Sequence, residues 1–188
     1  MPAWKTPMSA DSPTRTRAVF WPNFPTGRCS MKCNAARRCF PTCKRLIKAP
    51  KLYFCDPGLA AWLIGIRTAD HLRSHPLRGH LFENWVLTEL AKAAANAGHL
   101  PSVGFLRDKE GHEIDAIVES GPALHAIEIK SGQTVPSDAF KGLDFWCTKF
   151  PPNLTVKPWL VYGGDSPQQR KNATVQPWNH LSPLLSLI

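Results

Sequence analysis

Three charged residues in the middle of the chain have the types and the spacing to bind a divalent cation and to act on a phosphate ester. Asp115 lies early in one expected strand, and Glu128 and Lys130 lie at the end of the next, within residues 111–132. Carboxylate oxygens are hard ligands that suit Mg²⁺ (or Mn²⁺). The cation would polarise a phosphate and help to ionise a water, which the lysine would orient. Two acids and an amine in mostly buried strands are costly unless they are paired or hold a cation.

The alternation of side chains along a strand predicts that Asp115, Glu128 and Lys130 meet at one edge of a sheet. The first strand has Glu113, Asp115 and Ile117 on one face and Ile114, Ala116 and Val118 on the other, and the second has Leu124, Ala126, Glu128 and Lys130 on one face. A tight turn at Gly121-Pro122 makes the two strands neighbours. Glu113 is a candidate auxiliary acid because it precedes Asp115 by two positions.

The strongest expected helix, residues 77–97, brings a further acid toward these strands. Its apolar residues repeat every four positions, at Phe82, Val86, Leu90 and Ala94. This period and the Ala-rich composition predict a helix that Gly98 ends. Glu83 lies on a mostly apolar stripe near the start of the helix. It is therefore a candidate metal ligand, directly or through water.

The remaining segments complete the expected organisation. Residues 44–76 are predicted to form a lead-in, with a strand at 51–55, a helix at 59–66 that Asp56 caps with Pro57 in its first position, and a loop at 67–76. After the two central strands come a helix at 138–149 capped by Ser137, a strand at 154–162, a polar loop at 165–172, a strand at 174–178 and an apolar tail at 181–188 that docks as a short helix.

The order of elements from residue 77 predicts the fold class. With a further strand near 102–107, the order is α-β-β-β-α-β. Such an order predicts an α/β domain over residues 77–188, with a mixed central sheet flanked by helices.

The net positive charge of the chain comes from its first fifty residues. The 188 residues carry a formal net charge of +9, and residues 51–188 contain 13 basic and 13 acidic side chains. Charge alone therefore does not indicate a basic nucleic-acid-binding surface on the folded part. With no apolar run long enough to span a membrane and no visible signal peptide, the expectation is a cytoplasmic protein without a membrane partner.

Residues 1–43 are rich in Pro, Arg and Cys and show neither a helical nor a strand period. We expect a poorly ordered basic segment, and interpret it as a truncated or mis-framed remnant of a longer upstream region. Its cysteines, Cys29, Cys33, Cys39 and Cys43, lack the spacing of common zinc ribbons, so reduced thiols are expected. The scattered histidines His80, His99, His112 and His125 are expected to be structural or exposed.

Four phrases of the chain resemble a known family. They are KRLIKAPKLYFCDPGLAAWLIG, GHLFENWVLTEL, GHEIDAIVE and AIEIKSG, in this order. Together they resemble the C-terminal domain of unknown function found in many prokaryotic AAA-type ATPases. The pattern of Glu83, Asp115 and Glu128-Ile129-Lys130 likewise resembles the PD-(D/E)XK nuclease superfamily.

The resemblance implies a restriction-endonuclease-like core and a set of roles for its residues. It implies that Asp115, Glu128 and Glu83 hold Mg²⁺ (or Mn²⁺), that the Ile129 carbonyl adds a ligand, and that Lys130 is catalytic. The implied partners are DNA, an ATPase domain or a second copy of the chain. The chain itself has no phosphate-binding G-x-x-x-x-G-K-[ST] motif, so no ATPase activity is expected from it.

Each candidate site residue also has a plain structural interpretation. Glu128 and Lys130 could form an ion pair on one strand face, Asp115 could pair with Arg107 or Lys130, and Glu83 could pair with Arg78 or Lys51. The sequence therefore leaves two functions open. One is a Mg²⁺-dependent endonuclease-like domain, and the other is a non-catalytic module of an ATPase that docks nucleic acid or protein.

Overall fold

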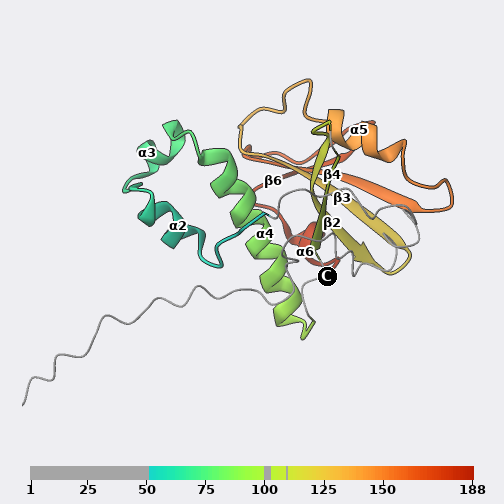
Figure 1. Cartoon of the computed structure of the whole chain (residues 1–188), viewed down its shortest axis with the longest axis horizontal. Helices are drawn as coiled ribbons and strands as arrows, with labels where there is room; N and C mark the ends of the chain where they lie inside the picture. Colours follow the sequence, from blue (N-terminus) through green and yellow to red (C-terminus); the bar gives the residue numbers. More distant parts are fainter. Residues whose placement is uncertain (1–50, 100–102, 109) are drawn as a thin grey trace, which may run out of the picture.

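The computed structural model of the chain describes residues 51–99, 103–108 and 110–188. Within them a six-stranded mixed sheet, in the order β1-β2-β3-β4-β6-β5, is flanked by helices (Figure 1). The elements are α2 (Pro57–Leu63), α3 (Ala69–Ser74), α4 (Arg78–Asn96), β1 (Val103–Arg107), β2 (Glu113–Ser120), β3 (Ala123–Lys130), α5 (Lys141–Cys147), β4 (Thr155–Tyr162), β5 (Gln168–Gln169), β6 (Thr174–Pro177) and α6 (Ser182–Leu185). The order from α4 to β4 is the expected α-β-β-β-α-β. The expectations for residues 1–43 lie outside the described residues.

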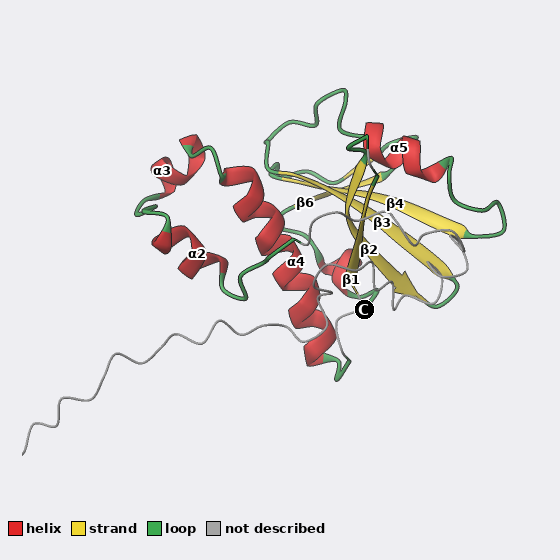
Figure 2. Cartoon of the chain, in the orientation of Figure 1, coloured by secondary structure: helices red, strands yellow, loops and turns green. Residues whose placement is uncertain are grey.

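The sheet combines antiparallel and parallel pairs. Strands β1, β2 and β3 pair antiparallel, β3, β4 and β6 pair parallel, and β5 pairs antiparallel with β6. Helix α5 is the crossover between the parallel strands β3 and β4 (Figure 2). The turn between β2 and β3 falls at Gly121-Pro122 as expected, and Gly121 has a φ of +55°, which favours glycine.

Two apolar cores hold the helices on opposite faces of the sheet. On one face α4 and the C-terminal residues pack on β2, β3 and β4 through Val86, Leu87, Leu90, Leu181, Leu184, Ala116, Val118, Ile127, Ile129 and Val161. On the other face α5 packs through Leu143, Trp146, Phe150, Leu106, Ile114, Ile117, Leu124 and Ala126. The apolar tail thus docks as expected, with α6 within it. No helix in the described part of the chain is long and apolar enough to cross a membrane.

Helix α4 confirms the expected amphipathic pattern. Val86, Leu90 and Ala94 are fully buried on its inner face. Gly98 follows the helix with a φ of +76°, which glycine tolerates without the steric cost of a Cβ. The expected Asp56 cap is also confirmed, because its side chain accepts hydrogen bonds from the N–H groups of Gly58 and Leu59 at the start of α2.

Several local expectations are wrong. The expected polar loop at 165–172 contains the short strand β5, which pairs with β6. Residues 51–55 form no strand, because the side chain of Asn84 rather than a neighbouring strand satisfies the backbone of Phe54. The expected loop at 67–76 contains α3, which Thr68 caps through the N–H of His71. Helix α5 begins at Lys141 and not after Ser137. Residues 136–141 instead form tight turns, in which the N–H groups of Ala139 and Lys141 donate to the carbonyls three residues earlier.

Candidate functional site

A β-bulge in β2 positions Asp115. The β1–β2 register runs from Gly104 opposite Ile117 to Leu106 opposite Ile114, so β2 has one extra residue there. Ile114 and Ile117 consequently pack in the same apolar core, and the expected strict alternation of faces along β2 is wrong at this point. Bulges bend a strand and re-aim its side chains. The extra residue therefore sets where the neighbouring Asp115 carboxylate points.

The Asp115 carboxylate is held against the end of β3. Its Oδ2 accepts a hydrogen bond from the backbone N–H of Ile129 at 2.9 Å, and the side chain is only 14% exposed. Burial, followed by the negative charge of Glu83, raises the pKa of Asp115 to about 6. The hydrogen bond and the nearby lysines reduce this shift without cancelling it.

Glu128 is the second buried acid, and one of its oxygens pairs with a lysine. Its Oε1 lies 2.5 Å from the Lys130 ammonium, and its side chain is only 10% exposed. Its Oε2 is buried and has no hydrogen-bond partner among the described residues. Burial, followed by the charge of Asp115, raises the pKa of Glu128 to about 7. Glu128 and Asp115 therefore interact electrostatically, as the sequence predicts.

Close approach of α5 keeps Glu128 enclosed. A Cβ on Gly142 would lie 2.5 Å from the Glu113 carbonyl oxygen and 3.4 Å from Glu128 Oε2. Only glycine leaves room for this contact at the start of α5. Lys130 is more open, with 40% of its side chain exposed. Burial lowers the pKa of Lys130, but its contact with Glu128 outweighs this effect and the net pKa is raised.

Glu83 reaches the same acidic group from α4, and a lysine lies between them. Lys51 Nζ lies 2.8 Å from Glu83 Oε1, contacts Glu113 Oε1 and lies 3.7 Å from Asp115 Oδ1. Tyr53 also donates a hydrogen bond from its hydroxyl to Glu83 Oε1, at 2.5 Å. Burial lowers the pKa of Lys51, but the contacts with Glu113 and Glu83 outweigh it and the net pKa is raised.

The residues predicted from the sequence therefore form one group, together with two that the sequence analysis did not place in the site. Asp115, Glu128 and Lys130 meet at the β2–β3 edge, and the charge of Glu83 reaches Asp115 from α4. The sequence indicates Lys51 only as an alternative partner of Glu83, and it gives no signal that places Tyr53 at the site. They precede Glu83 by 32 and 30 residues, and no local pattern marks a contact over that separation.

The arrangement gathers acidic side chains whose oxygen atoms are of the kind that bind divalent cations, with the Lys51 ammonium between Glu83 and Asp115. Three acids from α4, β2 and β3 supply hard oxygen atoms, and the buried Glu128 Oε2 is left without a partner in the described part of the protein. Buried carboxylates that raise one another's pKa are stabilised by a cation between them. The half-exposed Lys130 offers a positive charge beside this group to an anionic substrate.

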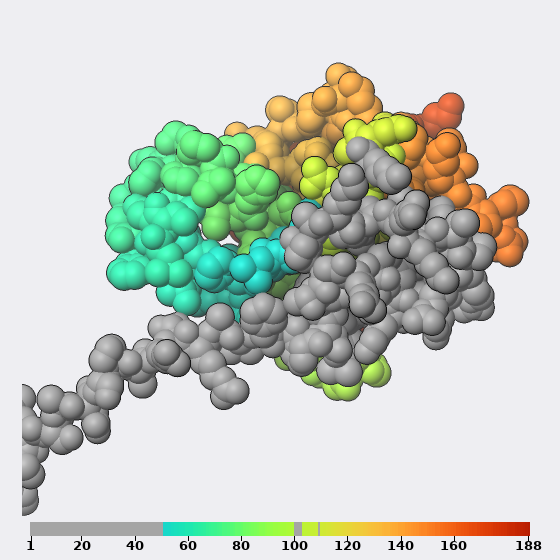
Figure 3. All heavy atoms as spheres, viewed as in Figure 1, coloured from blue at the N-terminus to red at the C-terminus, as the bar shows by residue number. Residues whose placement is uncertain are grey.

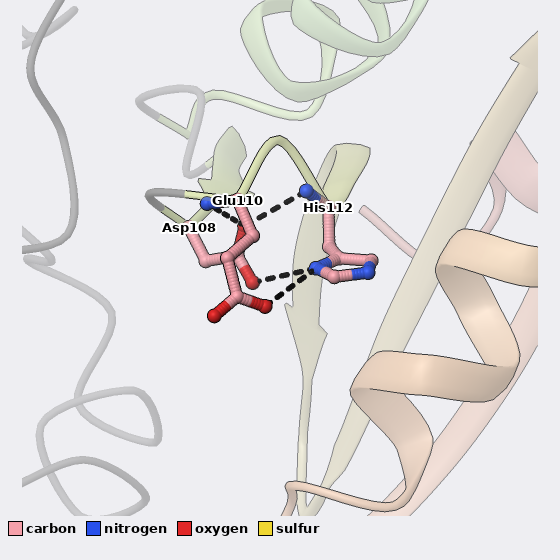
Figure 4. Close-up of side chains that lie close together, drawn as sticks. All are labelled: Asp108, Glu110 and His112. Carbon is pink, nitrogen blue, oxygen red and sulfur yellow. Dashed lines mark hydrogen bonds and ion pairs between the residues drawn. The ribbon is translucent and has the colours of Figure 1, made fainter.

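A second cluster lies in the turn between β1 and β2 (Figure 4). Asp108 Oδ1 accepts the backbone N–H groups of Glu110 and His112, and Asp108 Oδ2 lies 2.8 Å from His112 Nδ1. The His112 ring in turn stacks on Phe145 of α5, with ring centroids 3.8 Å apart. These contacts close the turn and join it to α5. The ligand atoms of Asp108, Glu110 and His112 lie within 4.8 Å of one another, close enough to hold a metal ion, although exposed acidic groups are common without one.

Comparison with known proteins identifies a family. Residues 78–181 match the family described as "Domain of unknown function (DUF4143)". The matched span contains Glu83, Asp115, Glu128 and Lys130, whereas Lys51 and Tyr53 precede it. Neither the curated proteins nor the solved structures contain a match to the chain. Because the matched span covers more than half of the 188 residues, the chain belongs to the DUF4143 family.

Proposed function

We propose that this chain is a metal-dependent nuclease-like domain that binds or cleaves DNA, with a restriction-endonuclease-like core. The observation that carries the proposal is the pair Asp115 and Glu128. Both carboxyl groups are buried, the pKa of each is raised, and Glu128 Oε2 has no partner among the described residues. Perturbed acids grouped with a lysine at a sheet edge are typical of a functional site.

The donor set fits Mg²⁺ (or Mn²⁺). Asp115, Glu128 and Glu83 would hold the ion, because their oxygens are hard ligands and Glu128 Oε2 has no hydrogen-bond partner within residues 51–99, 103–108 and 110–188. The bound ion would polarise the phosphate and lower the pKa of a coordinated water. Lys130 would neutralise charge that develops on the phosphate oxygens and orient the attacking water. Ile129 supports the site by holding the Asp115 carboxylate with its N–H.

The proposed partners follow from the sequence resemblance. DNA is the proposed substrate, and an ATPase domain or a second copy of the chain is the proposed partner. The balance of 13 basic and 13 acidic residues over 51–188 means that duplex affinity would depend on local contacts and the metal, not on overall attraction to phosphate.

Calorimetric titration with Mn²⁺ and Mg²⁺ tests the proposal. We expect the wild-type chain to bind a divalent ion and Glu128→Gln to bind it at least about tenfold more weakly, because the variant removes one of the charged ligands. Glu89→Gln is the matched control, since Glu89 lies on α4 in an exposed pair with Lys92. Nicking of supercoiled DNA should require the metal and fail in Glu128→Gln. Equal binding by the wild type and Glu128→Gln would overturn the proposal.

A non-catalytic docking module of an ATPase is the second candidate. Two observations favour it. Lys51 and Lys130 already neutralise much of the acidic group without a metal. Large apolar side chains are also exposed within residues 52–64, namely Leu52, Phe54, Leu59, Trp62, Leu63 and Ile64. Exposed apolar groups of this size are common at protein interfaces. This function takes precedence if no divalent ion binds.

A further inference from the structure

Lys51 occupies the position between three carboxylates that a cation would share. Its ammonium contacts Glu83, Glu113 and Asp115, which come from α4 and β2, while Lys51 itself belongs to the lead-in before α2. The lysine side chain is 21% exposed, so its head group is largely enclosed. An ammonium has three donors and no acceptor; that of Lys51 donates to Glu83 at 2.8 Å and contacts Glu113, while Asp115 at 3.7 Å interacts with it by charge alone.

The oxygen atoms of Glu83 and Glu128 differ in availability. Glu83 Oε1 accepts from both Lys51 at 2.8 Å and Tyr53 at 2.5 Å. Glu128 Oε2, by contrast, has no hydrogen-bond partner in the described ranges. Glu128 Oε2 is thus buried without a partner, whereas the protein's own lysine and tyrosine occupy the Glu83 side, so a cation held by Glu83 and Asp115 would have to displace Lys51.

The backbone of the lead-in is held to α4 at Phe54, three residues beyond Lys51. Asn84 Oδ1 accepts the Phe54 N–H at 2.6 Å, and Asn84 Nδ2 donates to the Phe54 carbonyl at 2.9 Å. In Figure 3 the first described residues, in cyan, run beside green α4. This attachment holds the backbone three residues from Lys51, so a rotamer change of the flexible four-carbon lysine stem would move the ammonium without moving the attachment. The ammonium can thus leave the acids without loss of the attachment.

We propose that Lys51 is a built-in counter-ion that competes with a divalent cation for Glu83 and Asp115, so that metal binding requires its ammonium to leave. The inference rests on the proposed function, because it concerns regulation of the same acidic group. Without metal, Lys51 stabilises the fold by reducing repulsion among the acids. With metal, the released ammonium becomes available to an anionic group, and a phosphodiester would favour this release by offering it a new partner.

Titration of Lys51→Met with Mn²⁺ tests the competition. The variant keeps a similar apolar stem and removes the charge, so we expect about tenfold tighter binding than in the wild type, within the usual range of coupling between two ligands. Lys92→Met is the matched control, since Lys92 forms a comparable 2.9 Å pair with Glu89 on the exposed side of α4. It should bind Mn²⁺ with wild-type affinity.

A second measurement uses the unaltered protein and does not depend on the folding of a variant. Lysine labelled with ¹³C at Cε reports the surroundings of each ammonium by NMR. Addition of Mg²⁺ should move the Lys51 resonance and leave that of Lys92 in place.

The outcomes separate this inference from the proposed function. Equal affinity of the wild type and Lys51→Met, or an unmoved Lys51 resonance in metal-bound protein, overturns the inference and leaves the metal site intact. Weaker binding by Lys51→Met also overturns it. If Lys51→Met binds the metal and the wild type does not, the inference is supported, but a metal-dependent activity of the isolated wild-type chain is overturned. Absence of binding in both proteins overturns both proposals.

Discussion

The carboxylate of Asp115 accepts the backbone N–H of Ile129 at 2.9 Å, so a side chain on β2 satisfies a backbone donor on β3. The bulge in β2 places Asp115 for this contact. The hydrogen bond orients the acid at the site and also contributes to the β2–β3 pairing. Substitutions at Asp115 can therefore separate its charge from its hydrogen bond.

We expect Asp115→Asn and Asp115→Ala to differ in stability. The asparagine retains an oxygen that can accept the Ile129 N–H, whereas alanine leaves that buried donor unpaired, at a cost of about 1–3 kcal/mol. Urea denaturation in EDTA should thus give Asp115→Asn a free energy of unfolding near that of the wild type and Asp115→Ala a lower one. Equal stability of the two variants would show that the hydrogen bond contributes nothing.

The wild type and Asp115→Asn should also differ in how metal changes their stability. A ligand that binds only the folded state stabilises it, by about 2.7 kcal/mol at one hundred times its dissociation constant. Mg²⁺ should therefore raise the melting temperature of the wild type and leave that of Asp115→Asn unchanged. A wild-type melting temperature that does not respond to saturating Mg²⁺ or Mn²⁺ would contradict the proposed metal site.

Without metal, stability should fall as the pH rises from 5 to 8. The pKa values of Asp115 and Glu128 are raised in the folded state, to about 6 and about 7, so folding favours their protonated forms. Their stabilising contribution is full below the ordinary carboxyl pKa and is lost as the pH rises through 6 and 7. We expect a decrease on the order of 2 kcal/mol in the free energy of unfolding, measured by denaturation in EDTA.

The control for this pH dependence is the double variant Asp115→Asn, Glu128→Gln, which should lose most of it. Metal affinity should change in the opposite direction, because carboxylates bind metal in their deprotonated form. Calorimetry should therefore give tighter Mg²⁺ binding at pH 8 than at pH 5.5. An affinity independent of pH over this range would indicate that other groups hold the ion.

Much of the fold could be predicted because its signals are local. The four-residue repeat in α4, the Asp56 cap and the Gly121-Pro122 turn each depend on residues close in sequence. The convergence of Asp115, Glu128 and Lys130 follows from this hairpin, which the sequence shows directly. Of the plain structural alternatives, Glu83 pairs with Lys51, and Glu128 pairs with Lys130.

The features that could not be predicted depend on contacts that no local sequence pattern encodes. The bulge at Asp115 adds one residue to a strand whose alternation otherwise looks regular. Residues 51–55 are apolar enough for a strand, yet their hydrogen-bond partner is the side chain of Asn84, thirty positions away. Helix α3 lies in a stretch whose polar character predicts a loop, and in the structure Thr68 caps it by accepting the His71 N–H.

Two glycines in matching helix positions should respond oppositely to alanine. Gly142 and Gly79 are each the second residue of their helix, in α5 and α4. A Cβ at position 142 would collide with the Glu113 carbonyl oxygen, whereas at position 79 its nearest contact is Ser131 Oγ at 3.9 Å. Gly79→Ala should stabilise by about 0.5–1 kcal/mol and Gly142→Ala should destabilise by about 1–3 kcal/mol in urea denaturation. Stabilisation by both would mean that α5 can move away from the acids.

Asn84→Leu should detach the lead-in from α4. The leucine has a similar volume but leaves the Phe54 N–H without its Asn84 acceptor and removes one of the two side-chain donors to the Phe54 carbonyl, which costs about 1–3 kcal/mol. Hydrogen exchange at the Phe54 amide should become faster than in the wild type. Thr88→Val is the milder comparison, because Thr88 contacts the Phe54 carbonyl at 3.3 Å but not the Phe54 N–H, and its hydroxyl also bonds the Asn84 carbonyl at 2.8 Å. Unchanged exchange in Asn84→Leu would show that other contacts hold this segment.

Lys130→Met should separate metal binding from catalysis. Lys130 pairs with Glu128 Oε1, while Glu128 Oε2 and the Asp115 carboxylate remain as ligands when the lysine is gone. We therefore expect Lys130→Met to bind Mn²⁺ at least as tightly as the wild type, because a competing positive charge has been removed. Cleavage of supercoiled DNA at saturating metal should fall about 10²–10³-fold, the usual effect of removing one group that stabilises transition-state charge.

The exposed Lys171 gives the control Lys171→Met, which should cleave at the wild-type rate. Wild-type cleavage by Lys130→Met would remove the lysine from the mechanism, and loss of Mn²⁺ binding would show that Lys130 instead keeps Glu128 in position for the ion.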